Sequence, residues 1–426
     1  MSGNHWKIHK FGGSSLADAA CFKRVAGILL ATTRPRVGVV VSAMGGMTNQ
    51  LLALCTLAER NDETLRDELN AIGSRYSETA KALVSGATLV EILDQWQADA
   101  TEIENLLAAV RETRSASRRS RDIVAGYGEI WSARLLAAHL AEHGDKGRGG
   151  TWIDARNVVH VRHSDLGPSV LWDRSRAAIR EVIANDFEGI AVMTGFIAVD
   201  EAGLQTTLGR NGSDFSAAIF AALLNADEHD IWTDVDGVMS ADPNRVPDAQ
   251  IIHSLSYNEA MELAYFGAKV IHPQTLGPVI DNGIAVVIRN SFEPDHPGSR
   301  ISAVAAPNGE IKGITAIGGM ALVNLEGAGM IGVPGTADRL FAALKEAGVS
   351  VTLISQASSE HSICIAVPDD LAERAQNVMG EAFADELDGG QIQSVDLTRG
   401  QSIVAVVGDG MAGHPGVAAR FFANLG

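Results

Sequence analysis

Across the first 300 residues, short runs of β-branched and aliphatic residues alternate with longer helical stretches, and this alternation constrains the fold most. Buried strands are predicted at 37–42, 189–194, 230–233 and 285–288. Helices lie between them, such as those predicted at 213–226 and 256–266, and the second opens with the capping box Ser256-x-x-Glu259. Strands joined by helical crossovers pair mostly in parallel, and helices cover both faces of the sheet. We therefore predict a three-layer α/β domain over residues 1–300, with a helical subdomain at 61–114 beside the sheet.

Beyond residue 300, prolines and glycines mark a linker, and an internal repeat follows. The segment 329–344 is echoed by 410–425. Both copies follow a strand-like run. The first copy continues into predicted strands at 349–355 and 362–367 and then a further helix. Together these elements have the β-α-β-β-α order of a ferredoxin-like unit. The second copy stops at its first helix. We expect one such module at 313–395, a truncated start of a second at 400–426, and a longer natural polypeptide.

The charge balance limits the partners of the chain. Asp and Glu number 52 against 34 Lys and Arg, a formal charge of −18, which opposes binding to nucleic acid or to an anionic membrane. The uncharged stretch 37–58 is long enough to span a bilayer, but its Ser, Gly and Asn residues favour a strand, a loop and a helix.

The cysteines bear on the location of the protein. Three widely spaced cysteines, Cys21, Cys55 and Cys364, favour reduced thiols in a reducing compartment. The chain shows no cationic and then apolar leader, so we predict a cytoplasmic protein.

The first predicted strand ends in a lysine and two glycines, in the run Lys10-Phe11-Gly12-Gly13-Ser14-Ser15. Glycines let backbone N–H groups approach an anion, a following helix adds its positive end, and a lysine adds a charge. The lysine precedes the glycines, so the run is neither a Walker loop nor a dinucleotide fingerprint. Taken alone, it fits a phosphate site and an ordinary turn about equally.

A second dense motif spans 206–214, again at a loop that opens a helix. Its arginine, Arg210, suits bidentate recognition of a carboxylate. Asp214 near the helix start is either a functional carboxylate or an N-terminal cap.

Two further clusters contribute charged residues. Asp234 follows a buried strand, where ligands bind in open α/β sheets, although Asp236-Gly237 is also a common turn. Lys269 follows a helix stop and is a reasonable phosphate partner for Lys10. No His or Cys cluster has zinc-ligand spacing, so we expect no metal site built from protein ligands alone.

Six motifs, in this order, resemble the aspartate kinase family over nearly the whole chain. They are Lys10 to Ser15, Ser42 to Asn49, Gly126 to Glu129, Thr206 to Asp214, Trp232 to Gly237 and Phe266 to Pro273. The repeat resembles the paired ACT regulatory modules of these enzymes. The pattern from Ile354 to Ser362 is most similar to the threonine-sensitive type, in which the kinase is fused to a homoserine dehydrogenase.

The resemblance implies an amino acid kinase domain followed by ACT modules. It also implies ATP-dependent phosphorylation of the L-aspartate side-chain carboxylate with Mg²⁺, the first step toward lysine, threonine and methionine. In the catalytic centre, Lys10 would stabilise the transferring phosphoryl group, Lys269 the nucleotide phosphates, and Asp214 would hold the lysines and the metal ion.

The same resemblance assigns the binding residues. Arg210 would bind the α-carboxylate of aspartate and Glu129 its α-ammonium, with hydrogen bonds from Ser42 and Thr48. Residues assigned to ATP are Lys10, Phe11, Gly12, Gly13, Thr233, Asp234, Met239 and Lys269. Gln356 would bind threonine as an allosteric effector, and pairing of ACT modules would give a homodimer or a higher homo-oligomer.

Two alternatives stay open at this point. One is another amino acid kinase, acting on glutamate, acetylglutamate or a nucleotide; the other is an amino-acid sensor whose kinase half has decayed. The sequence also departs from the family pattern, because Met239 stands where a tyrosine is frequent and Arg245 lies one place later than the usual arginine.

Overall fold

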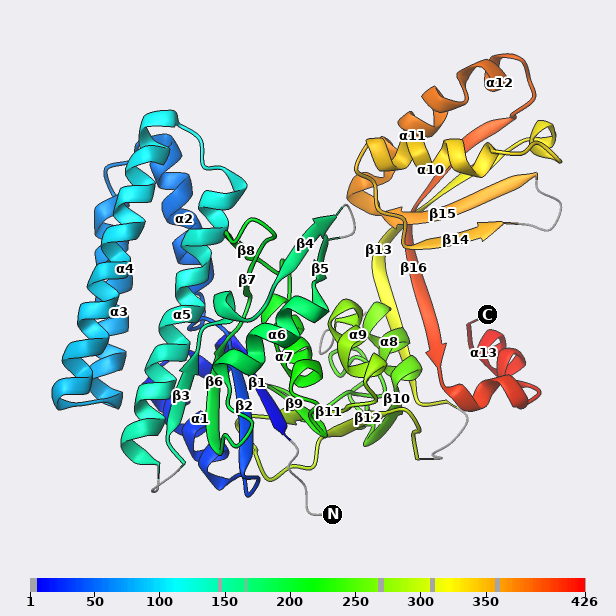
Figure 1. Ribbon diagram of the computed structural model, residues 1–426. Coiled ribbons are helices and arrows are strands. Elements are labelled where there is room, and N and C mark those ends of the chain that lie inside the picture. The colour runs from blue at the N-terminus through cyan, green and yellow to red at the C-terminus, as the bar shows by residue number, and fades with distance from the viewer. Residues whose placement is uncertain are drawn as a thin grey trace. The chain divides into compact units, whose positions relative to one another are not determined.

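The computed structural model describes residues 6–144, 148–164, 167–266, 272–306, 311–356 and 361–425. These residues fold into two compact units, which Figure 1 shows as ribbons. The first unit comprises Met1–Lys312 together with Asp409–Gly426, and the second comprises Gly313–Gly408.

An eight-stranded sheet forms the centre of the first unit, in the order β10-β12-β11-β9-β1-β2-β6-β3. Neighbouring strands pair in parallel except β11 and β12, which are antiparallel. The strands are β1 (Lys7–Phe11), β2 (Arg36–Val41), β3 (Gly150–Ile153), β6 (Gly189–Thr194), β9 (Glu228–Thr233), β10 (Ser254–Ser256), β11 (Ala285–Asn290) and β12 (Ser299–Ser302).

Helices pack on both faces of this sheet. On one face, α5 contacts β2, β3 and β6; on the other, α7 contacts β1, β2 and β9 and packs against α6 and α9. The helices of the unit are α1 (Ala19–Ala31), α2 (Met47–Arg60), α3 (Leu65–Leu83), α4 (Gly86–Thr113), α5 (Arg118–His143), α6 (Trp172–Val182), α7 (Gly212–Leu223), α8 (Tyr257–Tyr265), α9 (Pro273–Asp281) and α13 (Val417–Leu425). The predicted three-layer α/β architecture is confirmed.

The strands form where the sequence places continuous β-branched runs. From Val37 to Val41, β2 is buried, because helices cover both faces of the sheet. All four predicted strands are present, with ends shifted by no more than two residues. The predicted capping box at the start of α8 is present too: Ser256 and Glu259 exchange side-chain to backbone hydrogen bonds.

The helical region beside the sheet is larger than predicted. The stretch 61–114 forms α3 and α4, as expected, and both contact α2 and α5. The 26-residue helix α5 was not among the predicted elements. Two short hairpins were also missed: they consist of β4 (Val161–Ser164) with β5 (Gly167–Val170), and β7 (Ile197–Val199) with β8 (Gln205–Thr207).

The second unit is a four-stranded antiparallel sheet in the order β14-β15-β13-β16, and α11 packs on it and against α10. Its elements are β13 (Gly313–Glu326), α10 (Thr336–Glu346), β14 (Leu353–Gln356), β15 (Ser362–Pro368), α11 (Ala372–Ala382), α12 (Ala384–Asp388) and β16 (Ser394–Val407). The predicted β-α-β-β-α order is confirmed. The predicted division between 395 and 400 falls inside β16, which pairs with β13 over both halves of its length.

The uncharged stretch 37–58 folds as a strand, a loop and most of α2, as the sequence predicted. Among the described residues, no helix combines the length and the apolar character that a membrane span requires. Cys21 and Cys55 are buried free thiols, and Cys364 is half-buried.

Candidate active site

A cavity of about 400 Å³ opens where β1 and β2 end and α7 begins. Eight residues singled out from the sequence line it: Lys10, Gly12, Gly13, Ser42, Thr48, Glu129, Arg210 and Asp214. The cavity therefore lies at the carboxyl ends of parallel strands, where open α/β sheets bind their ligands.

Lys10 and Asp214 form an ion pair inside this cavity. Nζ of Lys10 lies 2.7 Å from Oδ1 of Asp214, and the two side chains are 11% and 23% exposed. Asp214 is in the first turn of α7, but the N-cap position belongs to Asn211, which makes no side-chain capping bond. The carboxylate thus orients Lys10 and does not cap the helix.

Two glycine loops line the cavity: the first glycine loop, Gly12–Ser15, and the second glycine loop, Ser42–Gly46. They touch each other closely. A Cβ atom on Gly13 would lie 3.2 Å from the carbonyl oxygen of Ala43, and one on Gly45 would lie 3.2 Å from the carbonyl oxygen of Gly13. Larger residues would push the loops apart, which explains why both strands end in glycine-rich segments.

Arg75 on α3 ties these two loops together, and nothing in the sequence pattern pointed to it. Its Nη2 donates to the carbonyl oxygen of Ala17 at 3.0 Å, just beyond the first loop, and to that of Gly45 at 2.8 Å in the second. Its Nη1 donates to the side chain of Gln50 at 3.2 Å. Arg75 is therefore a positioning residue that joins three segments far apart in sequence.

Glu129 is the buried acid of the site. It lies on α5, which approaches the second glycine loop so closely that a Cβ on Gly128 would be 2.8 Å from the Cβ of Ala43. The residue is 4% exposed, and among the described residues its Oε2 has no hydrogen-bond partner. Burial raises the pKa of Glu129 to about 8, against a lowering contribution from the Ala43 backbone. A buried carboxyl group without a partner requires a cation or a hydrogen-bond donor to offset the free-energy cost of its burial.

Arg210 supplies the opposite charge on the same cavity. It is exposed on the loop before α7, where Gly209 and Asn211 both have positive φ angles, 77° and 56°. The cavity therefore presents a carboxyl group and a guanidinium to one ligand. This combination suits a zwitterionic amino acid, whose α-ammonium and α-carboxylate carry opposite charges.

Of the residues assigned to the nucleotide, Lys10, Gly12 and Gly13 line this cavity, whereas Thr233, Asp234 and Met239, at and beyond the end of β9, do not. Trp232, the residue before Thr233, pairs with Phe11 across β9 and β1. Thr233 donates its hydroxyl to Asp234 at 3.1 Å, and Met239 forms a bridge with Ile251. Lys269 lies outside the described residues.

The side chain of Phe11 belongs to the core of the first unit. It is fully buried and stacks on Trp232 with ring centroids 5.6 Å apart. Because successive side chains of a strand point to opposite faces, the side chain of Phe11 points to the opposite face of the sheet from that of Lys10. The carbonyl oxygen of Phe11 accepts a hydrogen bond from the Ser42 amide at 3.1 Å, which links the two strand ends.

Two known protein families match parts of this chain. Residues 5–290 match the amino acid kinase family and residues 323–383 match the ACT domain. The chain belongs to the amino acid kinase family.

Within this family, the chain is similar to bifunctional aspartokinases. The chain is 39% identical over 435 residues to bifunctional aspartokinase/homoserine dehydrogenase 1, chloroplastic, of Arabidopsis thaliana, covering 99% of this chain and 47% of that protein. It is 38% identical to the bifunctional aspartokinase/homoserine dehydrogenase of Haemophilus influenzae, covering 98% and 51%. The chain thus spans about half the length of the curated relatives it matches.

Solved structures of aspartate kinases share the fold of this chain. The fold matches E. coli aspartokinase III in complex with aspartate and ADP, with a TM-score of 0.80 at 27% identity over 98% of this chain and 91% of that one. It also matches Clostridium acetobutylicum aspartate kinase, with a TM-score of 0.78 at 28% identity over the same shares. The resemblance to aspartate kinases is confirmed.

Proposed function

We propose that this chain is an aspartate kinase, which transfers the γ-phosphoryl group of ATP to the side-chain carboxylate of L-aspartate. One observation carries the proposal: a single cavity brings Lys10, Glu129, Arg210 and Asp214 together. Glu129 and Arg210 suit the two charged ends of an amino acid, and Lys10 beside the glycine loops suits a phosphoryl group.

The reaction requires no general base. A carboxyl group with a pKa of roughly 4 is already an ionised nucleophile at neutral pH. Catalysis then consists of alignment and of neutralising charge on the phosphoryl group in flight. Lys10 supplies that charge, and Asp214 keeps its Nζ in place through the 2.7 Å ion pair.

ATP would extend from this cavity toward the end of β9. Thr233, Asp234 and Met239 are proposed to contact the nucleotide, and Lys269 its phosphates. Mg²⁺ typically takes one or two carboxylates together with substrate phosphates. The chemistry fits, because Asp214 lies in the cavity and Asp234 is exposed at the adjacent strand end. The ion would neutralise phosphate charge when bound.

Coupled measurement of ADP release with a panel of acceptors tests the proposal. We expect turnover with L-aspartate and little with glutamate, acetylglutamate or nucleoside monophosphates. Acetylglutamate is excluded physically because its α-nitrogen carries no charge for Glu129. Activity restricted to another acceptor would refute the assignment, and absence of turnover with every acceptor would favour a decayed sensor.

Replacing Arg75 with alanine is expected to raise the KM for aspartate several-fold and to lower the free energy of unfolding by about 1–3 kcal/mol, because two backbone carbonyls lose their donor. Arg75→Lys should keep the positive charge but still show the raised KM for aspartate, since one ammonium group cannot reproduce the guanidinium that donates to both loops. Steady-state kinetics and urea denaturation measure both effects.

The matched control is Arg111→Ala on the neighbouring helix α4. Arg111 donates to the side chain of Asn61 at 3.0 Å in an exposed position, far in sequence from either glycine loop. If Arg75→Ala and Arg111→Ala lose stability alike and the aspartate KM changes in neither, Arg75 is structural only.

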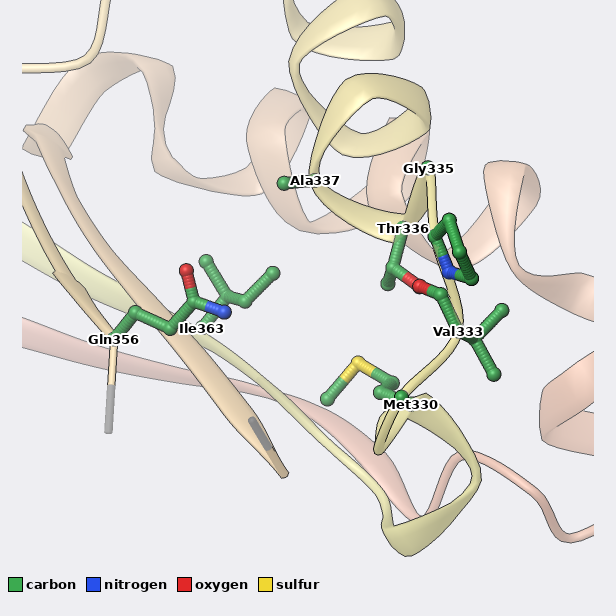
Figure 2. A pocket seen from close by; sticks show the side chains of 9 residues that line it. Met330, Val333, Gly335, Thr336, Ala337, Gln356 and Ile363 are labelled. Atoms are coloured by element: carbon green, nitrogen blue, oxygen red, sulfur yellow. The ribbon is translucent and has the colours of Figure 1, made fainter. Parts of the chain in front are cut away.

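A second cavity, of about 280 Å³, lies in the ACT unit (Figure 2). Gln356, at the end of β14, and Ile363 line one side; Met330, Val333 and Thr336 line the other. The first copy of the sequence repeat supplies most of the lining. The cavity offers an amide and a hydroxyl to a small polar ligand, and we propose that it takes threonine as effector.

Gln356→Ala is expected to weaken threonine binding at least tenfold in calorimetric titration, because it removes an amide that offers both donors and an acceptor. Gln401→Ala, on β16 and outside the cavity, serves as control. Equal threonine binding by Gln356→Ala and Gln401→Ala would remove Gln356 from the effector site.

The domain division, assembly and location remain proposals. We propose a catalytic domain at 1–300, a first ACT module at 313–395 and the start of a second at 400–426, with β16 passing from one module into the next. ACT modules pairing between chains would give a dimer or a higher oligomer. A cytoplasmic location fits the free thiols, although several relatives are named as chloroplastic.

A further inference from the structure

A third cavity, of about 300 Å³, lies in the kinase unit at the amino-terminal ends of the central strands. Trp6 precedes β1, and Arg36 is the first residue of β2. The lining also includes the last residue of α7, Leu223, and the segment that follows it. The opposite ends of β1, β2 and α7, which Figure 1 labels, lead to Lys10, Ser42 and Asp214 in the candidate active site. The two cavities therefore lie at opposite ends of the same three elements.

Three arginines line this cavity. Arg36 comes from β2, and Arg176 and Arg180 are one turn apart on α6. No Asp or Glu is among the described residues that line it. In a chain with 52 acidic and 34 basic residues, this is a local reversal of the overall charge.

Few hydrogen bonds or ion pairs among the described residues offset the positive charge of these three arginines. Arg36 donates one Nη2 bond to the carbonyl oxygen of Asn185, while its buried Nε has no partner among the described residues. Arg176 lies 3.6 Å from the carboxylate of Asp173, whose side chain is fully exposed, and such surface pairs contribute little. No described acidic group pairs with Arg180.

The remaining lining determines what kind of anion fits. The carboxyl end of α7 contributes a partial charge of about −0.5, which three guanidiniums outweigh. Asn185 and Asn225 add amide groups, and Trp6, Ile179 and Ile183 form apolar walls. At about 30 Å³ per water, the space holds about ten water volumes, more than one phosphate group requires.

We propose that this cavity is a binding site for a small phosphorylated metabolite, with its phosphoryl group held by Arg36, Arg176 and Arg180. Arginine is the residue best suited to such recognition, because its planar fork matches two phosphate oxygens. The proposal is independent of the kinase reaction, since none of these residues lines the candidate active site.

Calorimetric titration of the full chain with inorganic phosphate, pyrophosphate and glycerol 3-phosphate tests the site. The titrations use the Lys10→Ala background, so that phosphate binding in the candidate active site is suppressed. We expect saturable binding at one site in this background. Tighter binding of glycerol 3-phosphate than of inorganic phosphate would identify an organic phosphate as the ligand class.

Two variants added separately to this background, Arg36→Gln and Arg180→Gln, should each weaken binding at least tenfold. Arg174→Gln, which changes an arginine on the same helix outside the cavity, should leave it unchanged. Arg180 is exposed, so its variant remains informative even if Arg36→Gln unfolds. Absence of binding in the Lys10→Ala background would overturn the proposal, as would equal loss in Arg180→Gln and Arg174→Gln or binding of inorganic phosphate alone.

Discussion

Replacement of Lys10 with alanine is expected to lower kcat about 100-fold or more while changing the KM for aspartate little. Removing one preorganised group that meets charge developing in a transition state typically costs a factor of about 10²–10³. Lys10 is suited to this role because its side chain is only 11% exposed and its ammonium is held at 2.7 Å by Asp214. The charge that it meets grows during transfer, so the loss belongs to turnover more than to substrate binding.

Steady-state kinetics with varied aspartate and ATP measure this effect, and a thermal melt confirms that the variant is folded. Lys23→Ala, an exposed lysine on α1, is the matched control and should retain the kcat of the unmodified chain. A Lys10→Ala variant whose KM for aspartate rises as much as its kcat falls would show that Lys10 acts in ground-state binding.

Glu129 should make aspartate binding strongly dependent on pH. Burial raises the pKa of its carboxyl group to about 8 in the unliganded chain, so it is mostly neutral at pH 7. An ammonium group binds the ionised form. Below pH 8, aspartate must therefore displace a proton, and its KM is expected to fall up to about tenfold per pH unit as the pH rises toward 8, then to level off.

The raised pKa of Glu129 also affects the stability of the unliganded chain, which falls as the pH rises, whereas aspartate binding improves. A carboxyl group whose folded pKa is raised favours the folded state most below its unfolded pKa, and that contribution is lost as the pH rises through about 8. Glu129→Gln should thus make the unliganded chain more stable at pH 7 to 8, while weakening aspartate binding and abolishing its pH dependence.

Kinetics between pH 6 and 9, and calorimetry in two buffers with different ionisation enthalpies, measure the proton release directly. The control is Glu142→Gln, an exposed acid on the same helix, which should keep the pH profile of the unmodified chain. An aspartate KM that is flat over this range, or a Glu129→Gln profile that matches the unmodified chain, would contradict the pairing of Glu129 with the ammonium.

Much of the fold was predictable because its strongest signals are local. Continuous β-branched runs are typical of strands buried on both faces, and Ser256 with Glu259 marked the start of α8 before the structure showed it. The antiparallel pairing of β12 with β11 was not predictable, since a strand of four residues has no local mark of its direction. The long helix α5 was missed because its buried, glycine-containing middle has no clear amphipathic period.

The candidate site was predictable where charge and glycine concentrate in one motif. Lys10, Arg210 and Asp214 meet around one cavity, as the sequence indicated. Arg75 was not predictable, because its role depends on the contact of α3 with two loops distant in sequence. The motif around Lys10 also did not show that the side chain of Phe11 is buried in the core, because this depends on the face of β1 to which the side chain points.

Trapping of the reaction product with hydroxylamine tests the proposed activity most directly. An acyl phosphate acylates hydroxylamine, so the chain incubated with ATP, Mg²⁺, L-aspartate and hydroxylamine should yield the side-chain hydroxamate of aspartate, identified by mass spectrometry. Formation should require both ATP and aspartate and should fall at least 100-fold in Lys10→Ala. ATP consumption without any aspartyl hydroxamate would contradict phosphorylation of the aspartate carboxylate.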